Sequence, residues 1–241
     1  MSRPHREIPL IQILPNLMTV TAICAGMTSI RYGLLGNFEL AVLLILAAAV
    51  LDGLDGRMAR LLQSDSPMGA ELDSLADFLN FGVVPPLLLY YWALHEAPRM
   101  GWIAVLIYAV CCVLRLARFN VSAKSGESTG ETEFFTGVPS PGGAMLVLLP
   151  MFVAFAFDWD RVLTPLMLCL YMAGIGALLI SRIPTWSFKT VKVPQERVRY
   201  LLVGFAFAGA AVLSYPWTTL VVGTLAYVGA IIWGLLTHRR S

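Results

Sequence analysis

Charged side chains are scarce in this sequence. Only 13% of its 241 residues are Asp, Glu, Lys or Arg, whereas 58% are hydrophobic. Soluble domains carry about 25% charged residues, so this chain has too little polar surface to cover itself in water. The scarcity excludes an ordinary soluble fold and indicates that lipid surrounds most of the chain. The net charge of +2 is too small to indicate a nucleic-acid partner.

Cysteine is also sparse, and its placement excludes a zinc site or a disulfide framework. Cys24, Cys111, Cys112 and Cys169 lie in apolar stretches, without a CxxC spacing or a nearby histidine pair. We interpret them as small hydrophobic residues. The first 14 residues lack the continuous apolar centre of a cleavable signal peptide. We expect residues 1–14 to form an N-terminal interfacial segment.

Long apolar runs are what the sequence has in abundance. A membrane-spanning helix needs about 20 mostly apolar residues, and eight stretches come close to that length. We therefore expect an all-α fold, a polytopic membrane bundle of about eight transmembrane helices. It would form one membrane-embedded domain over residues 15–236, followed by a cytoplasmic tail at 237–241. The predicted spans are 15–35, 38–62, 69–94, 100–121, 142–157, 163–183, 198–214 and 217–236.

Lys and Arg are distributed unevenly between the two sides of this predicted bundle. Cytoplasmic loops carry the excess of positive charge, so we place the N-terminus in the cytoplasm. With that choice only Arg31, Arg99 and Arg161 of the 17 Lys and Arg residues fall on the outer side. Both termini then face the cytoplasm. We expect an active site on the cytoplasmic face of a cell (inner) membrane.

Four aspartates occupy positions where charge is costly in a membrane helix. Asp52 and Asp55 are three residues apart in the second span, and Asp73 and Asp77 are four apart in the third. Each pair therefore shares one helical face, and the buried carboxylates would repel one another. Divalent cations would compensate, and oxygen ligands without His or Cys favour Mg²⁺, Mn²⁺ or Ca²⁺. Acids at helix ends that reach the surface would explain at most one of the four.

Small residues lie beside these acids. Gly56 and Ala59 share the acidic face of the second span, and Gly69 lies one turn before Asp73. Alone, each could simply permit close helix packing. Next to four acids, we interpret them as the lining of a cleft with room for a ligand.

The segment from Asp52 to Asp77 fits the pattern D-x2-D-G-x2-A-R-x8-G-x3-D-x3-D at every fixed position. It resembles the signature of the CDP-alcohol phosphotransferase family. The resemblance implies a membrane enzyme in which an alcohol attacks a CDP-linked substrate and displaces CMP with divalent metal, expected as two ions. It further implies that Asp52, Asp55 and Asp73 bind metal. Asp77 would be the general base and could also touch the metal.

The chemistry of the residues agrees with these implied roles. A pyrophosphate would be repelled by carboxylates unless metal ions lie between them. A serine-like hydroxyl is a poor nucleophile and needs a base within hydrogen-bonding distance. Arg60 could donate two hydrogen bonds to phosphate, or it could serve only as a positive anchor on the cytoplasmic side.

Further strings resemble the integral membrane branch of the family that makes phosphatidylserine. They include LPN-x2-T at 14–19, FFTGVPSP at 134–141 and SRIPTWSFK at 181–189. The resemblance implies CDP-diacylglycerol as donor, L-serine as acceptor, and a homodimer among membrane lipids. It also implies that Asn16 and Thr19 contact the CDP-lipid, although polar residues on this helix could instead serve helix packing. The full set of expected CDP-lipid contacts is Asn16, Thr19, Asp52, Gly56, Ala59, Arg60, Gly69 and Asp73.

The acceptor's own chemistry suggests where it would bind. Serine carries a carboxylate, which pairs well with a guanidinium. Arg115, Arg118 and Asn120, at the inner end of the fourth span, are our candidates for binding serine or phosphate. Positive anchoring at the membrane surface would explain the two arginines equally simply.

Two other interpretations stay open on these residues. The same machinery could use glycerol 3-phosphate, inositol phosphate or choline as the acceptor. Buried acids also mark ion pathways, so a cation channel or ion-coupled transporter is a second class. Such proteins commonly have interrupted helices or inverted repeats, and the sequence gives no sign of either.

Overall fold

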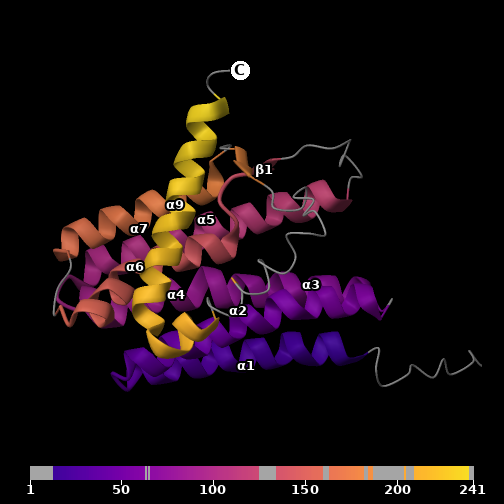
Figure 1. Cartoon of the computed structure of the whole chain (residues 1–241), viewed down its shortest axis with the longest axis horizontal. Helices are drawn as coiled ribbons and strands as arrows, with labels where there is room; N and C mark the ends of the chain where they lie inside the picture. The colour runs from indigo at the N-terminus through magenta and orange to yellow at the C-terminus, as the bar shows by residue number, and fades with distance from the viewer. Residues whose placement is uncertain are drawn as a thin grey trace, which may run out of the picture.

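The computed structural model describes residues 13–62, 64, 66–124, 134–159, 163–181, 184–186, 204 and 209–238 (Figure 1). Most of the predicted N-terminal segment 1–14 lies outside these residues. So do most of the predicted span at 198–214 and the last residues of the predicted tail, 239–241.

Helices make up nearly all of the described chain. One continuous helix runs from Pro67 to Leu94 and includes two π-helical stretches, η2 and η3. The helical elements are α1 (Leu14–Leu34), α2 (Phe38–Leu61), α3 (Pro67–Asp77), η2 (Phe78–Val83), α4 (Val84–Leu89), η3 (Tyr90–Leu94), α5 (Pro98–Lys124), α6 (Ser140–Phe157), α7 (Pro165–Ile180) and α9 (Pro216–His238).

The helix starts follow from local sequence. Pro occupies the first turn of α1, α3, α6 and α7, where its missing N–H costs no helical hydrogen bond. The side chains of Asn37 and Ser66 accept hydrogen bonds from backbone N–H groups and so cap α2 and α3. The cap at Ser66 begins the helix that carries Asp73 and Asp77.

Two prolines explain why the long helix changes geometry after Asp77. Pro85 and Pro86 have no N–H, so neither can bond to the carbonyl of Phe81. The Tyr108 hydroxyl of α5 donates to that carbonyl at 3.1 Å instead. This bond ties α5 to the helix of the acids, in the buried core between them.

The apolar helices make this chain a multi-pass membrane protein. Among the residues that the structure describes, four helices are long and apolar enough to cross a bilayer: Pro67–Leu94, Pro98–Ser122, Ser140–Phe157 and Pro216–Gly234. α7, at 16 residues, is apolar but shorter. The helical bundle is confirmed, whereas the count of eight spans stays a prediction.

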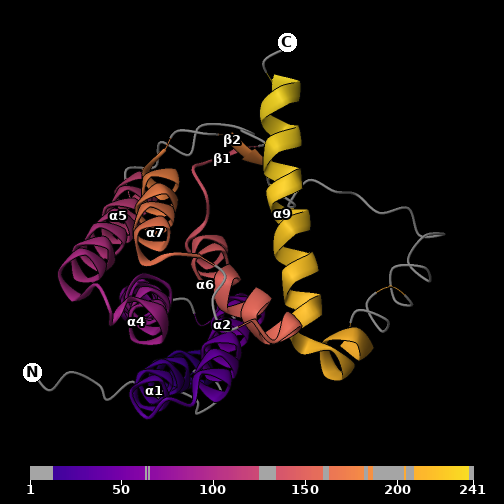
Figure 2. The same ribbon diagram turned by 90° about the vertical axis from the view of Figure 1, so that its left-hand side faces the viewer.

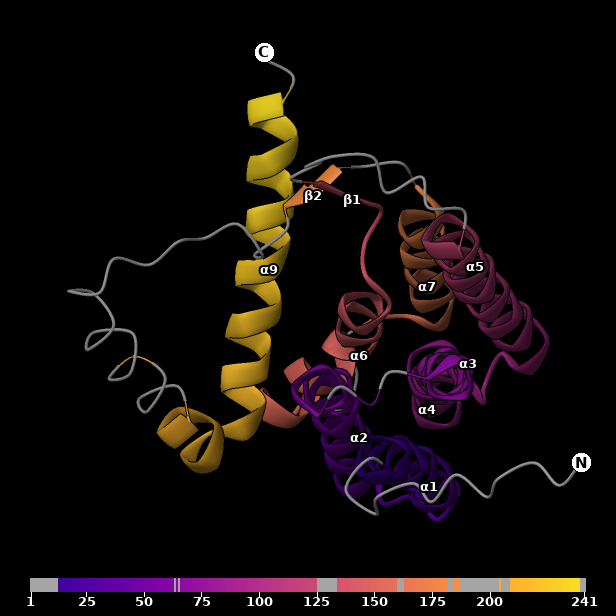
Figure 3. The same cartoon turned by 90° about the vertical axis from the view of Figure 1, so that its right-hand side faces the viewer.

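The elements are arranged as a bundle with one helix lying across it. α1 and α2 pack side by side along their length, and α5 packs against α7. Figures 2 and 3 look along the bundle, with α4 and α6 at its centre. In all three views α9 runs across these helices instead of alongside them. The predicted span 217–236 corresponds to α9, one of the helices long and apolar enough to cross a bilayer.

A short sheet was not predicted from the sequence. β1 (Phe134–Thr136) and β2 (Pro184–Trp186) pair antiparallel, with Phe134 opposite Trp186. Gly137 follows β1 at φ +87°, a conformation that favours glycine. The stretches 122–141 and 184–197 have loop-like composition, so their pairing across about fifty residues left no local signal.

Candidate active site

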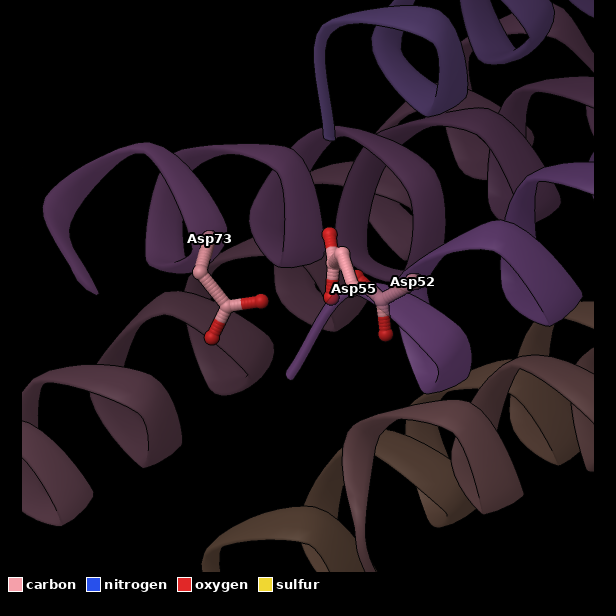
Figure 4. A group of neighbouring side chains, drawn as sticks. All are labelled: Asp52, Asp55 and Asp73. Carbon is pink, nitrogen blue, oxygen red and sulfur yellow. The ribbon is translucent and has the colours of Figure 1, made fainter. Parts of the chain in front are cut away.

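Three aspartates from two helices converge at the start of the long helix. Asp52 and Asp55 belong to α2, and Asp73 belongs to α3. One carboxylate oxygen of each lies within 4.8 Å of the others. Figure 4 shows the Asp73 side chain turned toward Asp55 and Asp52. The predicted spacing on each helix thus brings the acids to one place.

The donor atoms of this group suit a divalent cation. Oδ1 of Asp52 and Oδ1 of Asp55 are buried and have no hydrogen-bond partner among the described residues. Asp55 is only 3% exposed. Buried carboxylate oxygens without partners are costly unless a cation balances them. The group is able to bind a metal ion, and its all-oxygen ligands favour a hard one.

Thr19 holds one of these acids in place. Its hydroxyl lies 2.5 Å from Oδ2 of Asp55 and 3.1 Å from the Pro15 carbonyl oxygen, and the residue is buried. The hydroxyl donates to the carboxylate and leaves the opposite oxygen free. The predicted contact of Thr19 with the CDP-lipid stays a prediction, and the structure adds a direct contact with an acid.

Asp77 lies next to the three-acid group but not within it. Its carboxyl is within hydrogen-bonding reach of Asp52. The Arg115 guanidinium of α5 is close enough to Asp77 for their charges to interact. Asp77 therefore lies between the three-acid group and a cationic side chain of α5 in its interactions.

A cavity of about 330 Å³ opens beside Asp55 and Asp73. Of the eight predicted CDP-lipid contacts, only Asp52 is absent from its lining. The predicted residues that line it are Asn16, Thr19, Asp55, Gly56, Ala59, Arg60, Gly69 and Asp73. The structure thus brings α1, α2 and α3 together around one space.

Two glycines give this cavity its shape for different reasons. A Cβ at Gly69 would lie 2.9 Å from Oδ1 of Asn16, so glycine allows α3 to approach α1 closely. A Cβ at Gly56 would meet nothing within 4 Å. Gly56 lines the cavity, so a side chain there would extend into open space.

The sequence matches models of a known protein family over the residues that form this site. A sequence model of the CDP-alcohol phosphatidyltransferase family matches residues 12–193, and a second model, CDP-alcohol phosphatidyltransferase 2, matches residues 197–231. The chain belongs to the CDP-alcohol phosphatidyltransferase family. The first match, over residues 12–193, contains the four aspartates of the site and every residue that lines the cavity.

Relatives of the family are similar over most of the chain. The CDP-diacylglycerol–serine O-phosphatidyltransferase of Mycobacterium leprae is 45% identical over 99% of this chain and 80% of its own. The protein of that name from Helicobacter pylori is 36% identical over 76% of this chain and 75% of its own. The one from Bacillus subtilis is 33% identical over 73% and 91%, respectively.

The three predicted serine-binding residues of this family member make three different contacts. Nη1 of Arg115 donates to Oγ of Ser140 at 2.6 Å. Nη2 of Arg118 donates to the Ile180 carbonyl at 3.2 Å, which holds the end of α7. Asn120 bonds to Ser74, beside Asp73, at 3.0 Å. None of the three lines the cavity described above.

Sequence reasoning missed four residues of the cavity lining. They are Pro15, Ser64, Ser66 and Ala70. Oγ of Ser64 is buried without a partner among the described residues. Ser66 could have been found because Ser before Pro is a common helix-capping signal. Ser64 carried no such signal, since its position follows from the connection between α2 and α3.

Proposed function

We propose that this chain is a CDP-diacylglycerol–serine O-phosphatidyltransferase, which makes phosphatidylserine and CMP from CDP-diacylglycerol and L-serine. The observation that carries the proposal is the group of three aspartates beside a cavity. Eight of the site residues that the sequence predicted line this cavity. The names of the relatives, at up to 45% identity, favour serine over glycerol 3-phosphate, inositol phosphate or choline.

Asp52, Asp55 and Asp73 hold divalent metal in this proposal, as two ions of Mg²⁺ or Mn²⁺. When bound, the metal would neutralise the diphosphate and the charge that develops on the leaving phosphate. The two unpartnered carboxylate oxygens support this assignment. Asn16 and Arg60 lie on the cavity wall, where they can hydrogen-bond the CDP part of the lipid.

Asp77 takes the proton of the serine hydroxyl while the serine oxygen attacks the phosphorus of the phosphatidyl group. The new serine oxygen–phosphorus bond replaces the bond to CMP, which leaves with the electron pair of that bond. Asp77 suits this role because it borders the three-acid group without being part of it. A nearby base contributes about 10² to 10⁴ in rate.

The predicted sidedness fits this chemistry, because CDP-lipid, serine and CMP would exchange at the cytoplasmic face. We keep the single domain at 15–236, the cytoplasmic termini and the homodimer as parts of the proposal. The uneven placement of Lys and Arg supports the orientation.

Transfer of labelled serine into lipid tests the proposal. The full chain, purified into lipid nanodiscs, is given CDP-diacylglycerol, L-[¹⁴C]serine and Mg²⁺ or Mn²⁺. We expect labelled phosphatidylserine, its loss with excess EDTA, and its return when metal is added again. Serine that stays entirely out of the lipid under saturating metal and donor would overturn the proposed function.

A further inference from the structure

Two side-chain oxygens of α9 are buried against the bundle and have no hydrogen-bond partner among the described residues. Oη of Tyr227 and Oγ1 of Thr224 make no hydrogen bond with the described residues, and Thr224 is only 3% exposed. The two are three residues apart and so share one face of α9. The Tyr227 ring lies directly on Gly142 of α6, where a Cβ would be 2.7 Å from Oη.

Two other tyrosines of the described bundle differ, because each hydroxyl has a hydrogen-bond partner. The hydroxyl of Tyr108 donates to the Phe81 carbonyl at 3.1 Å, and that of Tyr171 donates to the Leu146 carbonyl at 2.5 Å. A buried hydroxyl without such a bond is costly and calls for an explanation. Packing on Gly142 explains the position of the Tyr227 ring, but it does not explain why the hydroxyl is buried without a hydrogen bond.

Arg115 connects this hydroxyl to the candidate general base. Its guanidinium lies within electrostatic range of both Asp77 and Tyr227. Nη1 is occupied by Ser140, but Nε is buried and has no partner among the described residues. Arg115 and Tyr227 also meet neighbouring residues of α6, since Arg115 bonds to Ser140 and the Tyr227 ring lies on Gly142. Arg115 Nε and Tyr227 Oη are thus two unused donors near the same part of α6.

Two such donors match the chemistry of a carboxylate. A guanidinium and a hydroxyl together offer hydrogen bonds and positive charge to both oxygens. Serine is short, since its carboxylate and hydroxyl are separated by two carbons. A molecule held at Arg115 by its carboxylate can therefore present its hydroxyl to the neighbouring Asp77.

We propose that Tyr227 is an acceptor-binding residue, which holds the carboxylate of serine together with Arg115. The inference rests on the proposed function and deepens it, because it assigns part of the acceptor site to the C-terminal helix. Gly142 is then a positioning residue, since it leaves the space that the Tyr227 hydroxyl occupies.

The test compares two tyrosines that each lose only a hydroxyl. Tyr227→Phe should raise the KM for L-serine about 10-fold, the effect of losing a hydrogen bond to a charged group. The KM for CDP-diacylglycerol and the affinity for Mn²⁺ should stay within twofold of wild type. Tyr171→Phe, the control, should lower the melting temperature while leaving the KM for serine unchanged, because its hydroxyl bonds only to backbone.

A second pair of variants tests whether the position of the Tyr227 hydroxyl matters. Gly142→Ala should displace Tyr227 and raise the KM for serine, whereas Gly174→Ala should not, since a Cβ there meets nothing within 4 Å. An unchanged KM for serine in Tyr227→Phe would overturn the inference, as would equal rises in KM for both substrates. Absence of serine transfer by the wild type would instead overturn the proposed function.

Discussion

Asp73 and Asp77 lie one helical turn apart on α3, yet their surroundings differ. Asp73 belongs to the group of carboxylates that converge within 4.8 Å, whereas Asp77 borders Asp52 and interacts with Arg115. The same substitution should therefore affect binding and turnover differently at a metal ligand and at a general base.

We expect Asp73→Asn to abolish turnover and to weaken Mn²⁺ and CDP-diacylglycerol binding together, because it removes a ligand. Asp77→Asn should lose about 10² to 10⁴ in kcat while it keeps most of both affinities. Calorimetric titration and single-turnover kinetics on the two variants separate these effects. Equal losses of affinity in the two would refute the base assignment.

Thr19 provides a second prediction at this scale. Removing its hydroxyl in Thr19→Val takes away the 2.5 Å contact with Asp55, so the affinity for Mn²⁺ should fall about 10- to 100-fold. Thr21→Val is the matched control on the same helix, because the Thr21 hydroxyl bonds only to the Leu17 carbonyl at 2.7 Å. Equal metal affinity in both variants would contradict a role for Thr19 in orienting the acid.

At the scale of a single element, one face of α2 forms the cavity wall and another does not. Neither Gly53 nor Gly56 has any atom within 4 Å of an added Cβ, but only Gly56 lines the cavity. Gly56→Ala should therefore raise the KM for CDP-diacylglycerol several-fold without lowering the melting temperature. Gly53→Ala should change neither quantity, and an equal effect of both would show that the face of α2 does not matter.

The sequence was informative about elements wherever the cause is local. Pro15 marks the start of the first span, and the three- and four-residue spacings predict which acids share a face. Ser66 and Pro67 carry an equally local start signal, although the predicted third span began at residue 69. The bond between Thr19 and Asp55 and the pairing of β1 with β2 depend on contacts between distant segments. No local pattern of residues marks either of them.

At the scale of the whole molecule, the bundle was predictable from composition, but the direction of α9 was not. Its apolar sequence resembles that of the other spans, and only the structure shows that it lies across them (Figure 1). The Tyr227 contact with Gly142 follows from this crossing. Apolar runs thus predict that a helix meets lipid, whereas packing decides how it is oriented.

Orientation in the membrane can be tested with two exposed methionines. Met68 and Met100 are 70% and 47% exposed and lie at opposite ends of the predicted topology. In a Cys24→Ser background, Met100→Cys should react with an impermeant maleimide on intact cells. Met68→Cys should react only after the membrane is opened, because the distribution of Lys and Arg predicts that its end of the bundle faces the cytoplasm. The reverse pattern would invert the topology.

Acceptor choice tests the central claim of a serine-specific transferase most directly. The purified wild-type chain receives CDP-diacylglycerol and Mn²⁺ with L-serine, glycerol 3-phosphate, inositol phosphate or choline in parallel, and CMP release is followed for each. We predict CMP release that depends on L-serine, with kcat/KM at least about 100-fold above every other acceptor, as expected when a site pairs its buried polar groups with one substrate. Faster CMP release with another acceptor than with L-serine would contradict the account.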